Sequence, residues 1–311
     1  MTDLTTKTRN NNLKTLRPRK HKQLEFFIAD DIDISTFRDE LTSMEHPFFA
    51  LKGGDTKVRE YKNGNVTVVA RSLAGIGLAT IFDKDIWIYV ISKLQEAINN
   101  NQPISRTISF TPYDFFITTN RNDGGKSYEL LRLALARLKG TVITTNMVYG
   151  KEKEETVSFG LIDSWRIVEE HKGKLEVGMV EVTLPDWLYQ AVTKTKVLQI
   201  SPDYFRIRKA IDRRLYEIAR KHCGNQHEFV ISLDKLYAKT GSTAALSKFK
   251  FNIKQLAKTN DLPDYEVFFD PSTDKVTFKN RNQNCAKVEA SRKREKGKKE
   301  IFKMKKNLLR K

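Results

Sequence analysis

Residues 232–258 read SLDKLYAKTGSTAALSKFKFNIKQLAK, and residues 111–140, TPYDFFITTNRNDGGKSYELLRLALARLKG, follow the same order. Each stretch begins with a serine or threonine, whose side-chain oxygen can accept a hydrogen bond from the first turn of a helix. Each then continues as a short helix, a glycine-containing turn and a longer basic helix. A short strand precedes each stretch, at residues 229–231 and 107–110. The sequence therefore predicts two copies of one strand, helix, turn, helix unit.

Segments of alternating polarity follow both units, as in the two strands of a hairpin. The first pair is 141–148 with 156–165, and the second is 265–269 with 275–279. A hairpin in this place is the wing of a winged helix. We therefore predict an α+β fold with two tandem winged helix-turn-helix domains, which is an arrangement suited to binding DNA.

The positive charge of the chain is concentrated at its ends. The formal net charge of the 311 residues is +18 at pH 7. Residues 1–23 carry seven Lys or Arg against one Asp, and residues 281–311 carry thirteen against three Glu, which leaves the centre at +2. Blocks of like charge indicate a polyanionic partner, with nucleic acid as the first candidate and an anionic membrane surface as the second. Solubility alone is the alternative explanation.

These features divide the chain into four parts. Residues 1–45 are predicted to form a basic and then acidic arm, and 46–195 a first winged-helix domain. Residues 196–280 are predicted to form a second winged-helix DNA-binding domain, and 281–311 a basic tail. Both basic tails are expected to be disordered, because their charges repel one another.

No segment has the pattern of an exported or membrane-spanning protein. The N-terminus lacks the apolar run of a signal peptide, and no stretch approaches the roughly 20 apolar residues of a membrane span. Cys223 and Cys285 have neither the number nor the paired spacing of a disulfide framework or a zinc site. We expect a cytoplasmic protein without a membrane partner.

A helix predicted over residues 204–223 is rich in cations, with only Asp212 and Glu217 to balance them. Like charges on one helix repel unless a phosphate backbone lies nearby, although a solvated face is the alternative. The residues expected to contact DNA phosphate here are Arg206, Arg208, Arg213 and Arg214.

The helix predicted from Thr243 to about Thr259 is the best candidate for reading DNA sequence. Helical periodicity predicts an inward stripe of Leu246, Phe249, Ile253 and Leu256. The opposite face carries Ser247, Lys248 and Phe251, which can reach base edges, and Lys254 and Lys258, which can hold phosphates. The candidate DNA-binding set also includes Ser242, Thr243 and Lys250.

The longer helix of the first unit, within residues 111–140, is predicted to have a less polar outward face. The residues predicted to point inward are Leu131, Ala134, Leu135 and Leu138. Lys126, Arg132 and Arg137 lie outward or on the flanks and are candidate DNA ligands, but Leu133 and Ala136 point outward as well. A protein interface is therefore the alternative to a DNA groove for this helix.

Enzyme motifs fail when they are tested against the residues. The run of Gly124 to Ser127 resembles the end of a phosphate-binding loop. The motif also needs a glycine at position 120, and this chain has Asn120 there. The histidines never form the His-x-His pair of a rolling-circle nickase. Helix capping and solvated acidity explain the two acidic groups, which are Asp83 with Asp85 and Asp30 with Asp31 and Asp33. We expect no catalytic activity, no metal and no cofactor.

Several long runs in the chain are distinctive. They are HPFFAL at 46–51, GLATIFDKD at 77–85, FGLIDSW at 159–165, DYFR at 203–206, RRLYEIARKHCG at 213–224, GST at 241–243 and DLPDY at 261–265. Together these runs resemble the bacterial plasmid replication initiator protein A family over about residues 46–265.

The resemblance implies a non-catalytic initiator that binds direct repeats in double-stranded origin DNA. It implies that such a protein helps to open an adjacent A/T-rich segment and brings in the host replication initiator and helicase machinery. One protomer could span two grooves, or could pair with another protomer as a homodimer. The chief alternative function is a winged-helix transcriptional repressor that binds a single operator, and a nickase or relaxase is the third.

Overall fold

The structure is a computed structural model, and it describes residues 16–18, 26–29, 47–63, 66–73, 75–149, 153–172, 174–193, 197–224 and 226–282. The described residues form a mixed α/β protein with antiparallel sheets. They divide into an N-terminal unit, residues 16–215 with 237–244, and a C-terminal unit, residues 216–236 with 245–282. The boundary thus lies near residue 215, whereas the sequence placed it near residue 195. The predicted disordered parts of the tails lie largely outside the described residues.

The N-terminal unit is built around helix α2 (Lys84–Asn99), most of whose residues are buried. One sheet has the order β2 (Arg59–Asn63), β3 (Val66–Ser72), β5 (Thr141–Tyr149) and β6 (Lys153–Gly160). Strand β1 (Phe26–Ala29) pairs with β9 (Val197–Ile200), and helix α5 (Asp186–Thr193) contacts α2.

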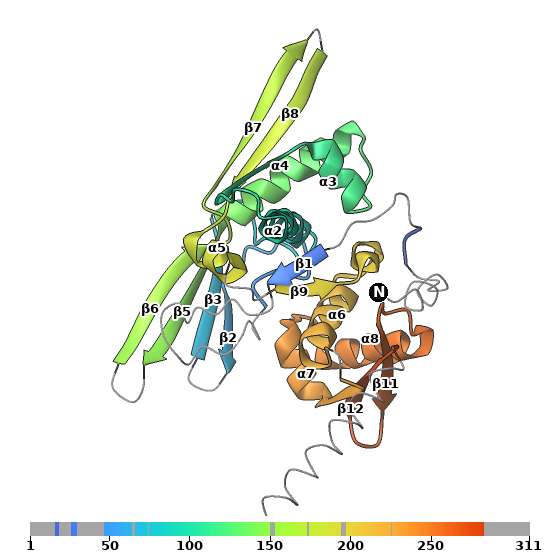
Figure 1. Ribbon diagram of the computed structural model, residues 1–311. Coiled ribbons are helices and arrows are strands. Elements are labelled where there is room, and N and C mark those ends of the chain that lie inside the picture. Colours follow the sequence, from blue (N-terminus) through green and yellow to red (C-terminus); the bar gives the residue numbers. More distant parts are fainter. Residues whose placement is uncertain are drawn as a thin grey trace, which may run out of the picture. The chain divides into compact units, whose positions relative to one another are not determined.

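A second sheet of this unit includes the strand of the first predicted unit. Strand β4 (Thr107–Phe110) leads into α3 (Pro112–Thr118) and α4 (Gly125–Gly140). The Thr111 hydroxyl accepts a hydrogen bond from the Asp114 amide at 3.3 Å, which confirms the predicted cap. Strand β4 pairs with β8 (Lys174–Thr183), which pairs with β7 (Ser164–Lys172), and these two strands extend as a long hairpin in Figure 1.

The hairpin expected directly after α4 forms as β5 with β6, but it joins β3 rather than β4. Ser164 and Trp165 belong to β7. The prediction of one strand over residues 156–165 is therefore wrong, because that segment contains the end of β6 and the start of β7.

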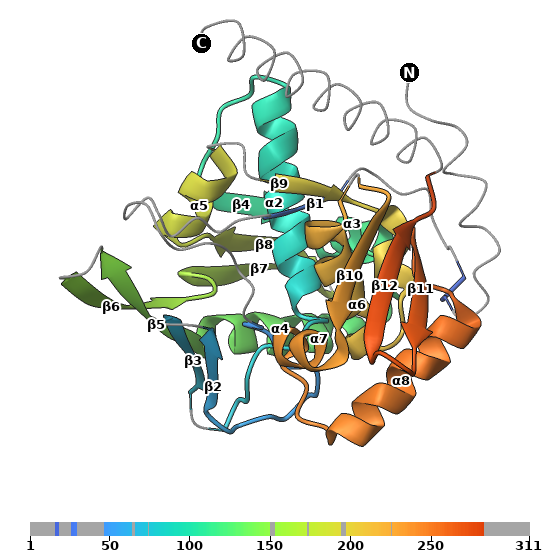
Figure 2. The ribbon, with the colours of Figure 1, turned by 90° about the horizontal axis from the view of Figure 1, so that it is seen from below.

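The second predicted unit forms one small sheet and three helices. Its order is α6 (Ala210–His222), β10 (Glu228–Ser232), α7 (Leu233–Thr240), α8 (Leu246–Thr259), β11 (Tyr265–Asp270) and β12 (Lys275–Asn280). A short 3-10 helix, η3 (Pro202–Arg206), precedes α6, so the single helix predicted over 204–223 is interrupted. The sheet order is β10, β12, β11, and Figure 2 shows α8 beside β11 and β12. In both sheets the first strand pairs with the last strand of the hairpin.

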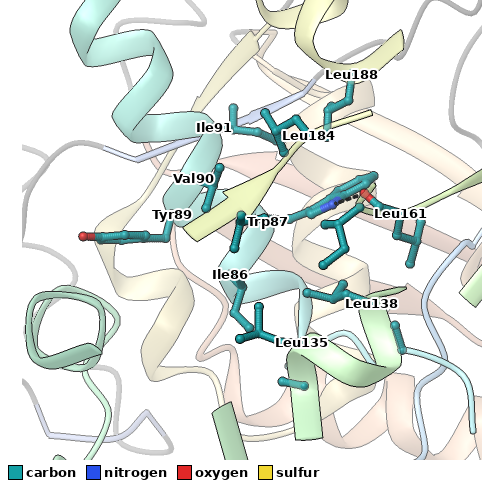
Figure 3. Packing of buried hydrophobic residues seen from close by; sticks show 14 of the residues in the cluster. Ile86, Trp87, Tyr89, Val90, Ile91, Leu135, Leu138, Leu161, Leu184 and Leu188 are labelled. Carbon is teal, nitrogen blue, oxygen red and sulfur yellow. Dashed lines mark hydrogen bonds between the residues drawn. The ribbon is translucent and has the colours of Figure 1, made fainter. Parts of the chain in front are cut away.

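The core of the N-terminal unit surrounds Trp87, whose indole nitrogen donates to the Leu161 carbonyl oxygen at 2.7 Å (Figure 3). Trp87 is 1% exposed, and its ring lies 5.2 Å from that of Phe49 and 5.8 Å from that of Trp187. Aromatic burial of this kind dominates the packing energy of a core. Trp87 is therefore a core residue and is not available for stacking on a base.

The turn between α7 and α8 has no room for a side chain at Gly241. Its φ is +67°, and an added Cβ would lie 2.2 Å from the Pro47 Cγ. Gly241→Ala is expected to lower the free energy of unfolding by about 1–3 kcal/mol from backbone strain, with the clash in addition. Thermal unfolding of the two proteins measures this loss.

Gly75→Ala is the matched control, because Gly75 has φ +82° and no heavy atom within 4 Å of an added Cβ. It carries the backbone strain without the clash. Equal losses in the two variants would show that Pro47 moves aside without cost.

Candidate nucleic-acid interface

Helix α8 exposes most of the face that the sequence assigned to DNA. Phe249 and Ile253 are 0% exposed and Leu256 is 4% exposed, as predicted. The exposed residues on the opposite side are Ser247, Lys248, Phe251, Lys254 and Lys258. Phe251 is 50% exposed, so its ring is open to a partner on this face.

Two details of the α8 prediction are wrong. The helix begins at Leu246 rather than at Thr243. Leu246 is 41% exposed and does not continue the inward stripe, because it occupies the first helical position, outside the packed turns. Thr243 is exposed and Ser242 is half-buried, and both lie in the turn before the helix.

The first turn of α8 begins without a side-chain cap. Its N-cap residue, Ala245, makes no side-chain cap bond, and the first turn contains no acidic residue. Free N–H groups at a helix start attract anions such as phosphate. Within the preceding turn, the Tyr237 hydroxyl donates to the Ala244 carbonyl oxygen at 2.7 Å, and the Ser242 hydroxyl accepts from the Ala244 amide at 3.3 Å.

Lysines and phenylalanines lie together on this surface. The Lys248 ammonium lies 4.8 Å from the centre of the Phe251 ring. The Lys250 and Lys254 ammonium groups lie 5.7 Å and 5.9 Å from the Phe269 ring on β11. Contacts between cations and rings restrain long side chains without neutralising them. The surface is therefore cationic and partly ordered before a partner binds.

The tip of the hairpin formed by β11 and β12 is acidic. Hydrogen bonds from Ser272 and Thr273 lower the pKa of Asp270 to about 2, so this carboxylate is ionised at neutral pH. Asp274 accepts a hydrogen bond from Lys250 at 2.6 Å. Lys250 is thus committed to an ion pair, and the positive charge offered to a partner lies on the exposed face of α8 rather than at the tip.

Arg213, which was expected at a DNA phosphate, is instead buried. Its side chain is 1% exposed, donates to the Asp85 carboxylate and donates to the carbonyl oxygens of Ile207 and Phe205, each at 3.1 Å. Its guanidinium also lies 4.5 Å from the Phe82 ring centre. Asp85, on α2, supplies the neutralising charge. The prediction for Arg213 is therefore wrong.

The same correction applies to two further arginines. Arg206 pairs with Asp203 at 2.8 Å with its side chain 9% exposed. Arg214 is 9% exposed and donates to the Lys239 carbonyl oxygen at 2.8 Å. Neither is placed to reach a phosphate, because each is buried among its acceptors. Arg208 is exposed and stays a candidate.

Helix α4 has the predicted two faces. Its buried residues include all four of the predicted ones, Leu131, Ala134, Leu135 and Leu138. Lys126 and Arg132 are exposed, as a DNA ligand must be. Leu130 and Leu133 are also exposed, at 45% and 47%. Both alternatives for this face, a DNA groove and a protein interface, stay predictions.

Arg137 on α4 has a structural role. Its Nε and Nη2 atoms donate to the two oxygens of Asp83, both at 2.8 Å, and the hydrogen bond with Asp83 raises the pKa of Arg137. Asp83 also accepts from the Thr80 amide at 2.8 Å, so it is not a solvated acid. The guanidinium is occupied, and the prediction of Arg137 as a DNA ligand is wrong.

Among the described residues, no helix combines the length and apolar character needed to cross a membrane. Within the same ranges, no three His, Cys, Asp or Glu side chains gather as a metal-binding group.

A family model and a similar protein both relate this chain to replication proteins. A family model described as replication initiator protein A matches residues 38–267. A relative from Wigglesworthia glossinidia brevipalpis, provisionally named a replication protein, is 60% identical over 265 residues, which cover 85% of this chain and 96% of the relative.

Solved structures with a similar fold include domains 2 and 3 of RctB. A selenomethionine derivative of these domains matches with a TM-score of 0.56 and 12% identity, over 75% of this chain and 94% of that one. A second structure, of RctB residues 155–483, matches with a TM-score of 0.51 and 12% identity, over 89% of this chain and 99% of that one. At this identity the likeness concerns the fold.

Proposed function

Because this chain belongs to the replication initiator protein A family, we propose that it initiates plasmid replication by binding repeated double-stranded sites in an origin through helix α8. The observation that carries the proposal is the exposed face of α8, where lysines, a serine and a half-exposed phenylalanine stand over a buried apolar stripe. A helix of this kind suits the major groove of DNA.

We further propose that the chain contains two winged helix-turn-helix motifs, one from α2 to β8 and one from α6 to β12. Both have a helix, a strand, two helices and a hairpin in chain order, and in both the first strand pairs with the last. In the N-terminal unit, β5 and β6 are inserted between α4 and the hairpin β7–β8. That hairpin then takes the place of the wing.

In the proposed complex, Ser247, Lys248 and Phe251 lie against base edges, and Lys254 and Lys258 contact the phosphates. Phosphate contacts supply most of the affinity and no sequence preference. Occupied repeats strain the adjacent A/T-rich duplex, whose flexible steps bend at a lower energetic cost than the rest. The host initiator and helicase machinery are the proposed protein partners.

The protein is proposed to act in the cytoplasm, without catalysing a reaction itself. Repression of a single operator was the alternative, but both the family model and the relative point to replication instead.

The test of this function compares supercoiled plasmids carrying intact and scrambled origin repeats. We expect tighter binding to the intact repeats and permanganate-reactive thymines next to them only. Equal affinity for both plasmids would remove the proposed repeat recognition. Saturating protein without reactive thymines, with or without host proteins, would remove the proposed opening step.

A further inference from the structure

A short piece of the N-terminal arm is fastened to the N-terminal unit. Leu16 is 6% exposed. The Arg17 amide donates to the Arg206 carbonyl oxygen at 2.9 Å, and the Arg206 Nε donates back to the Arg17 carbonyl oxygen at 2.5 Å. The Asn120 side chain donates to the Pro18 carbonyl oxygen at 3.1 Å. The backbone of this piece is therefore fixed, while the Arg17 side chain is exposed.

This piece lies outside residues 38–267, which the family model matches, while its partners Arg206 and Asn120 lie inside that range. It joins η3 to the end of α3, where the turn before α4 begins. The arm thus brings a cation beside the turn that leads from α3 into α4.

Positive charge gathers around Arg17 without enough negative charge to balance it. Asp85 accepts hydrogen bonds from both Arg121, at 2.7 Å, and Arg213. Neighbouring atoms partly shield Arg17 from water and so lower its pKa, although the side chain reaches solvent. The charges of Arg213, Arg121 and Arg208 lower the pKa further, while Asp85 opposes them. Among the described groups that act most on Arg17, Asp85 is the one anion, and two arginines already share it.

The outward members of this group can be reached by a ligand. Arg17 and Arg208 are exposed, and the Arg121 side chain is 26% exposed. In the part of the chain that the structure describes, no ion pair or hydrogen bond occupies the guanidinium of Arg17 or Arg208. Guanidinium groups bind phosphate with paired, directed hydrogen bonds.

We propose that Arg17, Arg121 and Arg208 form an accessory site for a backbone phosphate of duplex DNA, and this proposal rests on the proposed function above. A DNA phosphate is favoured over a soluble phosphate compound because the group is open and lies beside the turn that leads into α4. The first turn of α4 has no acidic residue, and its N-cap residue, Gly124, makes no side-chain bond. The backbone N–H groups of this turn can therefore add donors for an anion.

The test uses the full-length protein with Arg17→Ala and Arg208→Ala combined. The control combines Lys52→Ala and Arg71→Ala, two exposed cations of the same unit, so that both proteins lose the same charge. Arg121 is left intact because it neutralises Asp85. Alanine keeps the backbone bonds of Arg17, and circular dichroism checks the fold.

Binding to repeat and scrambled duplexes is measured across a potassium chloride series. We expect the Arg17/Arg208 variant to reduce the slope of log K against log salt by about 0.9 on both duplexes, since one phosphate contact contributes about 0.9. The control keeps the wild-type slope, and a variant with lysine at positions 17 and 208 recovers most of it. A slope that falls equally in the variant and the control would overturn the proposal.

Inorganic phosphate and ATP at constant ionic strength distinguish the source of the phosphate. If either raises the melting temperature of the wild type but not of the Arg17/Arg208 variant, and the DNA slope is unchanged, the site serves a soluble ligand and the proposal is wrong. A wild type that binds both duplexes equally would instead contradict the repeat-specific function, while the slope comparison on scrambled DNA would still decide this site.

Discussion

Asp85→Ala is expected to lower the free energy of unfolding of the N-terminal unit by about 3–5 kcal/mol, because it removes the carboxylate from a buried ion pair. Asp85 is 2% exposed at its side chain and is shared by Arg121 and Arg213. Its removal leaves two guanidinium groups near each other, and Arg213 is too deeply buried to gain water. Chemical denaturation of the full-length protein, followed by tryptophan fluorescence, measures the loss.

Arg213→Ala should cost less than Asp85→Ala, because Asp85 keeps Arg121 as a partner at 2.7 Å. Arg208→Ala, on the same chain segment but exposed, should change stability by about 0.5 kcal/mol or less. If Asp85→Ala does not fold, the Arg213→Ala comparison still decides the question. Similar small losses for Arg213→Ala and Arg208→Ala would show that the buried pair contributes nothing to stability.

Local patterns in the sequence predicted most of the elements. Strand β4 covers the predicted residues 107–110, and the four predicted inward residues of α4 are buried. The residues predicted on the outward face of α8 are exposed, namely Ser247, Lys248, Phe251, Lys254 and Lys258. These features depend on capping, turn residues and periodicity, which act over a few neighbouring residues.

The failed predictions depend on contacts between distant parts of the chain. Nothing near Arg213 in sequence indicates that Asp85, 128 residues away, neutralises it. Arg214 is likewise satisfied by a carbonyl oxygen at Lys239. The prediction of the first hairpin was wrong for another reason. Two hairpins of alternating polarity, β5–β6 and β7–β8, follow α4, and alternation alone does not show which of them pairs with β4.

Lys248→Ala is expected to reduce the preference for repeat over random duplex by about 5- to 150-fold, equivalent to the 1–3 kcal/mol carried by a good base contact. Lys248 is exposed on the first turn of α8, where recognition helices meet base edges, and its ammonium is held 4.8 Å from the Phe251 ring. Ser247→Ala should act in the same direction. Fluorescence anisotropy with both duplexes at one salt concentration measures the ratio.

Lys254→Ala separates affinity from sequence reading, because this residue is placed further along the helix, where backbone contacts are expected. It should weaken binding to all duplexes alike and reduce the salt slope by about 0.9. Lys279→Ala is the control for lost charge, since Lys279 follows the fully buried Phe278 on β12 and so points away from the packed side of the sheet. If Lys248→Ala and Lys254→Ala both lose affinity equally for repeat and random DNA, α8 contacts phosphates only, and sequence must be read by another element of the chain.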